Sequence, residues 1–487
     1  MAGIRILFVQ DNGINESLAL TELSAFLQVR GHQTHLLLAR QEGRTLDRKA
    51  AGFEPHLVVL PCNVFGHRFV LDTADRLRRV LPGVPILVGG THPTFSPSVL
   101  EHPAVDWILV GEAELAVASL ADRLACGKGP EGIPGIWWKE GGKVVSTGPA
   151  ALLESLDELP AADRGLYLRY GFMRRFPWKK FSTGRGCVNR CSFCYNNRVR
   201  SLYRGAAGNV VRRKPVERVF QEIEDVARQS RLDWVHFSDD LFVTDPQWLE
   251  RFCVEYPRGF SLPFSCNSSG DRMTREAATL LGRAGCRVVA IGVETASEER
   301  RVRWLGKPVT NAVLESAAQH VHAAGMKLVT FNMIGLPGET LEDAIATIRY
   351  SRRLGAEAVR VTMAVPLPGT RMALEATDAG QLDQRLAHDF SAQIDLAERP
   401  YGPYYDLPDA AGIEALLNLA PLVRRLPTGA GLARMLRLVP RAATRPARCW
   451  MALQERGIYG FPFAAGLDFF LHVGNPWMRT TNYVALI

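Results

Sequence analysis

The chain has 487 residues, of which 47% are hydrophobic and 22% are charged, and its formal net charge is +8. This composition excludes a largely disordered protein, and the length predicts more than one domain. No block of Lys and Arg is interleaved with aromatic residues, so nucleic acid is not an expected partner. No secretory signal precedes the first apolar run at Ile4, and no uncharged stretch is long enough to span a bilayer, so we expect a cytoplasmic location.

The first part of the chain alternates short apolar runs with amphipathic stretches. The runs are typical of buried parallel strands and cover 6–10, 34–39, 56–61, 85–90 and 106–111. Between them, Leu20, Leu23 and Leu27 repeat at helical spacing, and a second helix is expected from Val70 to Val80. The pattern predicts a doubly wound, Rossmann-like α/β domain over 1–125, with its ligand at the carboxyl ends of the strands.

A less periodic segment follows at 126–175 and is rich in Gly, Pro and acidic residues, with a hairpin candidate at 137–147. We expect it to be an inter-domain linker. A second alternating series then predicts a partial (β/α)6 barrel of TIM type over 176–375, with strands at 179–184, 234–239, 264–269, 287–295, 327–335 and 358–366. Residues 376–487 lack this alternation of strands and helices. Helical stretches at 413–425 and 431–438 predict a mainly helical C-terminal cap or substrate domain.

Nine cysteines in a chain of this kind argue against a disulfide framework. Cys187, Cys191 and Cys194 form a C-x3-C-x2-C motif directly after a strand and a Gly-Arg-Gly turn, so three thiolates can converge on one metal centre. A structural zinc site would want a fourth ligand nearby, whereas an iron–sulfur cubane held by three thiolates leaves one iron open to a chelating substrate. The other cysteines are scattered and are expected to be small buried hydrophobes: Cys62, Cys126, Cys253, Cys266, Cys286 and Cys449.

The segment GRGCVNRCSFCYNN, with an aromatic residue before its last cysteine, resembles the signature of the radical SAM superfamily. The resemblance implies a [4Fe–4S] cluster, S-adenosylmethionine as cosubstrate, and a reducing partner such as flavodoxin or ferredoxin. Further segments match in order: 291–295, whose Glu would approach the ribose, 335–340, on the adenine side, and 365–370, at the end of the sixth strand. The S-adenosylmethionine contacts that the resemblance implies are Phe193, Asp239, Glu294, Gly335 and Pro337.

The chain departs from this pattern in the third strand. Relatives often carry Arg where this chain has Asn-Ser-Ser-Gly-Asp at 267–271, so the carboxylate of S-adenosylmethionine needs another cationic or hydrogen-bonding partner. Asp239 and Asp240 end the second strand. They are expected either to contact cofactor or substrate or to form a helix N-cap.

The GGTHPTFSP turn and the VDWILVGEAE segment resemble the cobalamin-binding domain that precedes many radical SAM domains, although a generic nucleotide-binding sheet would look similar. The Asp-x-His-x-x-Gly pattern that supplies a lower cobalt ligand elsewhere is missing after Asp11. His67, in the loop after the third strand, is expected either to approach the lower face of cobalt or to be solvated. The implied cobalamin contacts are Asn12, Gly13, Cys62, Asn63, Gly89, Gly90, Thr91, Gly111 and Glu112.

Together the resemblances imply a cobalamin-dependent radical SAM methyltransferase that methylates an unactivated carbon by way of a 5′-deoxyadenosyl radical and methylcobalamin. A cobalamin-dependent radical SAM cyclase or rearrangement enzyme and a noncatalytic cobalamin or redox sensor stay open, and no catalytic acid or base can be named. Leu and Arg residues at 416–441 and aromatic residues at 459–477 could serve a lipid-like, tetrapyrrole or natural-product substrate, although core packing explains most of the aromatic residues equally well. The same C-terminal residues could make a peripheral membrane contact or simply pack a helical cap.

Overall fold

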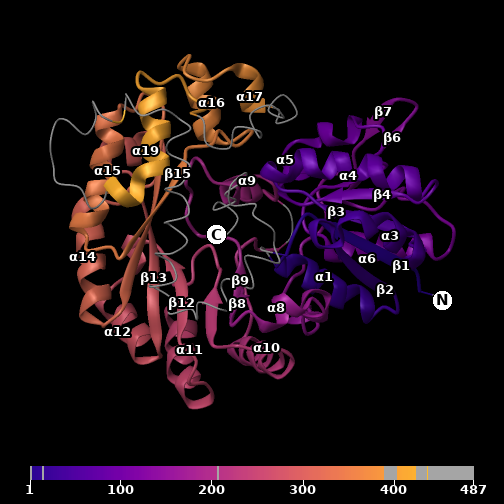
Figure 1. Cartoon of the computed structure of the whole chain (residues 1–487), viewed down its shortest axis with the longest axis horizontal. Coiled ribbons are helices and arrows are strands. Elements are labelled where there is room, and N and C mark those ends of the chain that lie inside the picture. Colours follow the sequence, from indigo (N-terminus) through magenta and orange to yellow (C-terminus); the bar gives the residue numbers. More distant parts are fainter. Residues whose placement is uncertain (1–2, 14–15, 206–207, 389–402, 424–435, 437–487) are drawn as a thin grey trace.

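The computed structural model describes residues 3–13, 16–205, 208–388, 403–423 and 436. Two sheets form the framework, one on each side of the short helix α9 (Tyr195–Leu202) (Figure 1). The predicted fold class is confirmed, because a doubly wound α/β domain precedes a half-barrel of parallel strands.

The first sheet has the strand order β2-β1-β3-β4-β5-β6-β7. Its five parallel strands are β1 (Arg5–Gln10), β2 (Gln33–Leu38), β3 (Leu57–Pro61), β4 (Ile86–Gly89) and β5 (Trp107–Leu109). Its main helices are α1 (Leu18–Gln28), α3 (Leu46–Phe53), α4 (His67–Val80), α5 (Thr91–Phe95) and α6 (Glu114–Leu124). In β1, Ile6 and Phe8 join one hydrophobic core while Leu7 and Val9 join another. Both faces of the sheet are therefore covered, which is why the strands are apolar throughout.

The segment predicted to be a linker contributes to this sheet. β6 (Ile136–Glu140) pairs antiparallel with β5, and β7 (Lys143–Val145) pairs with β6. The predicted hairpin is present, but it extends the sheet instead of standing apart. The buried Ile136 joins the core on one face of the sheet, and the half-buried Trp137 packs against the core on the other face.

The second sheet is an open half-barrel with the strand order β15-β14-β13-β12-β11-β8. Its strands, all parallel, are β8 (Trp178–Phe181), β11 (Trp234–Phe237), β12 (Phe264–Ser268), β13 (Cys286–Glu294), β14 (Lys327–Ile334) and β15 (Ala358–Met363). The helices on its outer side are α10 (Val216–Gln229), α11 (Pro246–Gly259), α12 (Arg275–Arg283), α14 (Asn311–Ala323) and α15 (Leu341–Arg353) (Figure 1). This topology brings the carboxyl ends of all six strands to one edge.

The described residues after the half-barrel are helical: α16 (Arg371–Asp378), α17 (Gln384–His388) and α19 (Ala410–Val423). α19 matches the first predicted C-terminal helix. The second, at 431–438, lies outside the described residues except for Leu436, as do the C-terminal aromatic residues and arginines that suggested a membrane contact or an apolar substrate. Within the described ranges, we find no helix with the length and apolar character needed to cross a bilayer.

Buried ion pairs join the two domains. Arg185, just before the cysteine motif, contacts Glu22 and Glu114 of the first domain at 2.6 Å each and Glu112 at 3.1 Å. Lys214 contacts Glu22 at 2.7 Å. Although burial alone raises the pKa of Glu22, the charges of Lys214 and Arg185 lower it to about 2. The interface therefore depends on charges that have little access to water.

Candidate functional site

The three clustered cysteines lie on the loop between β9 (Gly184–Arg185) and α9, at the carboxyl edge of the half-barrel. All three are partly buried. Cys194 is the N-cap of α9, and its Sγ accepts a hydrogen bond from Asn196 N at 3.4 Å. Cys187 Sγ accepts one from Asn189 N, also at 3.4 Å. Backbone N–H groups and a helix N-terminus thus face two of the sulfurs, an arrangement that stabilises negative charge on them.

The thiols are protonated when no metal is bound. Burial raises the pKa of Cys187, raises that of Cys191 to about 11 and raises that of Cys194 to about 12. The charge on one sulfur further raises the pKa of another, which shows that the three lie near one another. A metal centre bound here would displace their protons. Three converging thiolates without a fourth cysteine in the motif suit a cluster with one open iron.

Asp239, which follows β11, anchors the start of the cysteine loop. Its carboxylate accepts hydrogen bonds from Thr183 N at 3.0 and 3.1 Å and from Thr183 Oγ1 at 2.7 Å. The expected N-cap role is wrong for Asp239 and Asp240, since the N-cap of α11 is Asp245. Asn267 Nδ2 donates to the Asp239 carbonyl at 3.1 Å, so the segment that lacks Arg supports this anchor.

Glu294 ends β13 beside a lysine that sequence reasoning missed. Lys307 Nζ donates to Glu294 Oε1 at 3.0 Å and to the Gly292 carbonyl at 2.6 Å. The charge of Lys307 also acts to lower the pKa of Cys187 and Cys191, so it lies near the cysteine loop. Lys307 follows a short helix, α13 (Glu298–Arg303). Its distance in sequence from Glu294 matches no recognisable motif, so the pair could not be found from the sequence.

Glu294 also has an unusual backbone. Its φ is 67°, in the left-handed region that non-glycine residues rarely adopt. Such strain is typical of functional sites, where surrounding contacts hold the residue in place.

The turn at 335–340 is fixed by hydrogen bonds to its backbone. The Glu339 carboxylate accepts from Gly335 N at 2.5 Å and from Leu336 N at 3.2 Å. Arg300 donates to the Pro337 and Gly338 carbonyls at 3.0 Å each. Gly335 has φ +78°, and a Cβ there would lie 2.4 Å from the sulfur of Met363, so the turn requires glycine. Phe193 packs against the half-barrel core from the cysteine loop.

Three of the predicted cobalamin contacts are exposed at the ends of β3 and β4: Asn63, Gly90 and Thr91. Asn63 Oδ1 accepts from the backbone N–H of the residues two and three further on, which fixes the turn after β3. Gly90 has φ +112°, and a Cβ there would lie 2.6 Å from the Cys62 carbonyl oxygen. Cys62 and Gly89 are buried behind them. This edge offers accessible backbone and small polar groups, which suits the binding of a bulky cofactor.

Four other predicted contacts are either buried or face the second domain. Asn12 and Gly13 are buried, and a Cβ on Gly13 would lie 3.0 Å from the side chain of Leu38. Gly111 and Glu112 face the second domain, where Glu112 N donates to the Tyr203 hydroxyl at 3.1 Å. A Cβ on Gly111 would lie 2.3 Å from that hydroxyl. Close packing between domains therefore accounts for the glycine at 111.

The expected surroundings of two single residues are wrong. Cys126 is exposed, because it follows the end of α6 at the surface, whereas Cys62, Cys253, Cys266 and Cys286 are buried as expected. Cys449 lies outside the described residues. His67 is not in a solvated loop. It is the first residue of α4 and is only 3% exposed.

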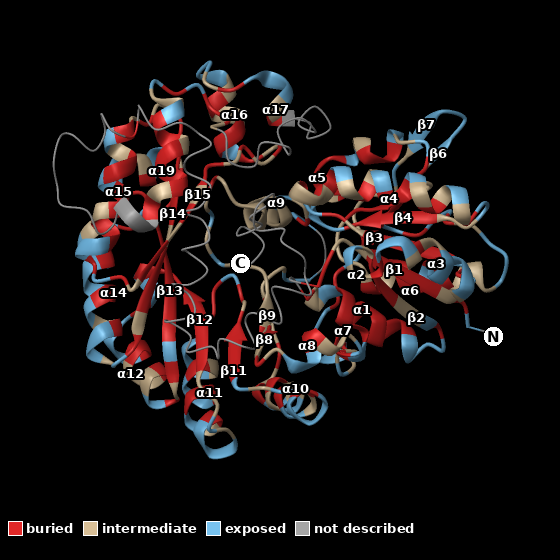
Figure 2. Ribbon diagram, in the orientation of Figure 1, coloured by how far each residue is buried: buried red, intermediate tan, exposed pale blue. Residues whose placement is uncertain are grey.

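Helix α9 connects the cysteine loop to the first domain. Tyr195, the residue after Cys194, stacks on Phe95 of α5 with ring centroids 4.7 Å apart. The Arg198 guanidinium lies 5.1 Å from the centre of the same Phe95 ring. All residues of α9 except the exposed Ser201 are of intermediate exposure, as the tan ribbon between the two domains shows (Figure 2). The carboxyl edges of the two sheets therefore meet at this helix.

Comparison with known proteins identifies both domains. Residues 4–121 match the model of the B12 binding domain, and residues 181–351 match that of the radical SAM superfamily. The chain belongs to the cobalamin-binding radical SAM enzymes. Its cofactors are accordingly a [4Fe–4S] cluster, S-adenosylmethionine and cobalamin.

Named relatives of this radical SAM protein include methyltransferases. An uncharacterized methyltransferase of Pyrococcus horikoshii is 27% identical over 325 residues, which are 66% of this chain and 69% of that protein. The cobalamin-dependent radical SAM methyltransferase TokK of Streptomyces tokunonensis is 29% identical over 208 residues, or 39% of this chain and 27% of TokK. The radical SAM methyltransferase TsrM from Kitasatospora setae, solved with cobalamin and a [4Fe–4S] cluster bound, has the same fold, with a TM-score of 0.67. The two chains are 18% identical, and the match covers 94% of this chain and 100% of that one.

Proposed function

We propose that the chain is a methyltransferase that methylates an unactivated carbon of a lipid-like, tetrapyrrole or natural-product small molecule. One observation carries the proposal: the stacking of Tyr195 on Phe95 at 4.7 Å, which brings the residue after the last motif cysteine against the first domain. Radical transfer between two cofactors needs them close together and shielded from water. The methyltransferase names of the relatives in Pyrococcus horikoshii and Streptomyces tokunonensis support methyl transfer over other uses of the same cofactors.

In this proposal Cys187, Cys191 and Cys194 hold the cluster. When bound, the cluster and S-adenosylmethionine supply a carbon-centred radical and cobalamin supplies a methyl carrier. A reduced flavodoxin or ferredoxin is the proposed electron donor. The fit for the cluster rests on the partly buried sulfurs and on the N–H groups that face Cys187 and Cys194.

Lys307 and Glu294 are the proposed polar contacts of S-adenosylmethionine. The ammonium of Lys307 lies near the cysteine loop and replaces the arginine that the third strand lacks, so it can pair with the carboxylate of the cosubstrate. Glu294 accepts from the ribose hydroxyls. Gly335 and Pro337, held by Glu339 and Arg300, present a fixed backbone to the adenine.

For cobalamin we propose contacts from the exposed edge of the first sheet, namely Asn63, Gly90 and Thr91. Gly90 presents backbone without a Cβ at this edge, so a cofactor can approach closely. Glu112 is excluded from this set, because its carboxylate pairs with Arg185 at 3.1 Å.

The test is an anaerobic reconstitution with iron, sulfide and hydroxocobalamin, followed by reductant, S-adenosylmethionine and candidate substrates. Bound cobalamin, 5′-deoxyadenosine and S-adenosylhomocysteine are quantified. Methyl transfer predicts stoichiometric cobalamin and both nucleoside products. Formation of deoxyadenosine without S-adenosylhomocysteine would contradict methyl transfer and indicate cyclisation or rearrangement. The absence of both products from a chain with an intact cluster would indicate a noncatalytic sensor.

A further inference from the structure

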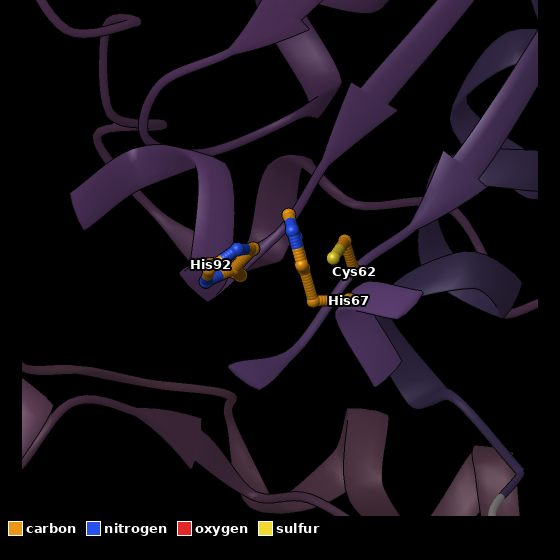
Figure 3. Close-up of side chains that lie close together, drawn as sticks. All are labelled: Cys62, His67 and His92. Atoms are coloured by element: carbon orange, nitrogen blue, oxygen red, sulfur yellow. The ribbon is translucent and has the colours of Figure 1, made fainter. Parts of the chain in front are cut away.

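Three metal-binding side chains meet inside the first domain, away from the cysteine loop. Cys62 follows β3, His67 begins α4 and His92 lies in α5. The Cys62 Sγ and one imidazole nitrogen from each of the two histidines all lie within 4.8 Å of one another (Figure 3). The two rings contact edge to face, with centroids 4.3 Å apart. Their residues are 2%, 3% and 0% exposed, so the group is closed to solvent.

Backbone hydrogen bonds fix two of these residues relative to each other. Cys62 N donates to the Gly89 carbonyl at 2.7 Å, and His92 N donates to the Cys62 carbonyl at 3.1 Å. The close approach requires glycine at position 90, where a Cβ would lie 2.6 Å from the Cys62 carbonyl oxygen. The strand ends thus hold Cys62 and His92 close together without a ligand, and such preorganisation lowers the cost of binding one.

We propose that Cys62, His67 and His92 form a mononuclear site for Zn²⁺ or a similar first-row divalent ion. One thiolate and two imidazoles are a donor set that zinc accepts, with a fourth position left for water or another donor. Donors around a tetrahedral zinc ion stand roughly 3.5 Å apart, as follows from bonds of about 2.0–2.3 Å. Side-chain adjustments of at most about 1.3 Å would bring the observed group to that geometry.

The geometry favours a small ion over the cobalt of cobalamin. The corrin ring occupies four positions of its cobalt, so only one of the three donors could serve as a lower ligand. A corrin also needs an open surface, whereas these side chains are at most 3% exposed. A small ion uses all three donors at once.

Binding exchanges a proton for the metal. Burial raises the pKa of the Cys62 thiol, so the thiol is protonated before the ion arrives. The divalent ion forms a bond to sulfur and the thiol proton leaves to solvent, with no change of oxidation state. The apparent affinity therefore rises as much as tenfold per pH unit in the range where the free thiol is protonated.

The test uses the full-length, cobalamin-loaded chain in which Cys187, Cys191 and Cys194 are all replaced by Ala, so that the motif thiols cannot compete. Zinc is measured by mass spectrometry after equilibrium dialysis, and the cobalamin-free chain is titrated with Co²⁺. We expect one equivalent of zinc and a near-ultraviolet thiolate-to-Co²⁺ charge-transfer band. Cys62→Ser in this background removes the band, and His67→Gln or His92→Gln weakens Co²⁺ binding at least tenfold. Cys126→Ser, which alters an exposed thiol, leaves both signals unchanged.

Folding is checked separately. Circular dichroism of the Cys62→Ser chain should match that of its parent, and Zn²⁺ should raise the melting temperature of the parent but not of the His92→Gln chain. The proposal is overturned if the parent binds no zinc, or if the charge-transfer band survives Cys62→Ser. It is also overturned if cob(II)alamin bound to the parent shows a ¹⁴N splitting in its electron paramagnetic resonance spectrum that His67→Gln removes, because the imidazole would then ligate cobalt.

Discussion

Lys307 donates a 3.0 Å hydrogen bond to Oε1 of Glu294, and both residues are buried at the end of β13. The pair places a cation next to the cysteine loop in a domain whose third strand lacks the expected arginine. It also holds Glu294 in its left-handed backbone conformation, which a non-glycine residue adopts only under constraint.

Replacing Lys307 with Met should weaken S-adenosylmethionine binding. The change removes a charge-assisted hydrogen bond worth about 1.5–3 kcal/mol, which corresponds to roughly a 10- to 150-fold rise in Kd. Equilibrium dialysis on the cluster-loaded chain measures the effect. Lys143→Met, which removes an exposed lysine from β7, serves as the matched control. Equal affinities in the two variants would remove Lys307 from the proposed site.

Alanine at Cys187, Cys191 or Cys194 should abolish S-adenosylmethionine cleavage. Each change removes one of three proposed cluster ligands, while the exposed edge of β3 and β4 stays intact. We expect iron content and 5′-deoxyadenosine to fall to background and bound cobalamin to stay near the parent level. Cys126→Ala should behave as the unmodified chain, since its thiol is exposed and distant in sequence. Full cleavage activity in any of the three variants would show that the ligand assignment is wrong.

Asp239→Ala should destabilise the start of the cysteine loop. The Thr183 N–H and hydroxyl would lose their buried acceptor, at a cost of about 1–3 kcal/mol. The expected result is a lower denaturation midpoint and faster loss of iron to a chelator. Asp271→Ala, at an exposed residue, should change neither. If the two variants lose iron at the same rate, the anchor has no part in holding the cluster.

The fold was largely predictable from the sequence, because buried parallel strands are apolar throughout and their helices show 3.6-residue spacing. The cysteine motif was predictable for a related reason, since its three ligands lie within one loop. The Lys307–Glu294 pair was not, because it depends on how the chain turns after α13.

Gly111 and Glu112 show why a contact at a strand end is hard to assign from sequence. Their position after β5 favoured a ligand contact, but strand ends also face other domains, and here they meet Tyr203. The group of Cys62, His67 and His92 depends on the register of β3 with β4, which no spacing in the sequence encodes.

Stability should fall with rising pH because of Glu339. Burial raises its pKa to about 7 from an ordinary value of 4.5. The native state therefore binds a proton more tightly than the unfolded state, so the stabilisation is complete below pH 4.5 and is lost as pH rises to about 7. Glu339→Gln keeps an acceptor for the Gly335 and Leu336 N–H groups and should flatten the pH dependence of the urea midpoint between pH 5 and about 8. An unchanged pH profile would argue against a protonated Glu339.

Arg185→Gln should loosen the contact between the domains. Glu22 and Glu114 would lose their closest cation, and breaking a buried ion pair typically costs about 3–5 kcal/mol. We expect faster limited proteolysis of the segment that connects the two sheets and a larger radius of gyration. Arg251→Gln, which removes an exposed ion pair with Glu217, is the control and should leave both measurements unchanged.

Helix α9 is a single eight-residue element that carries a proposed cluster ligand at its N-cap and stacks its first residue on the other domain. If metal binding stabilises this helix, it also stabilises the contact that the helix makes with the other domain. By thermodynamic reciprocity, closing the domains must favour metal loading by the same amount. Assembly of the two halves and maturation of the cluster are then coupled equilibria, and a chain that lacks iron should also hold its cobalamin domain less tightly.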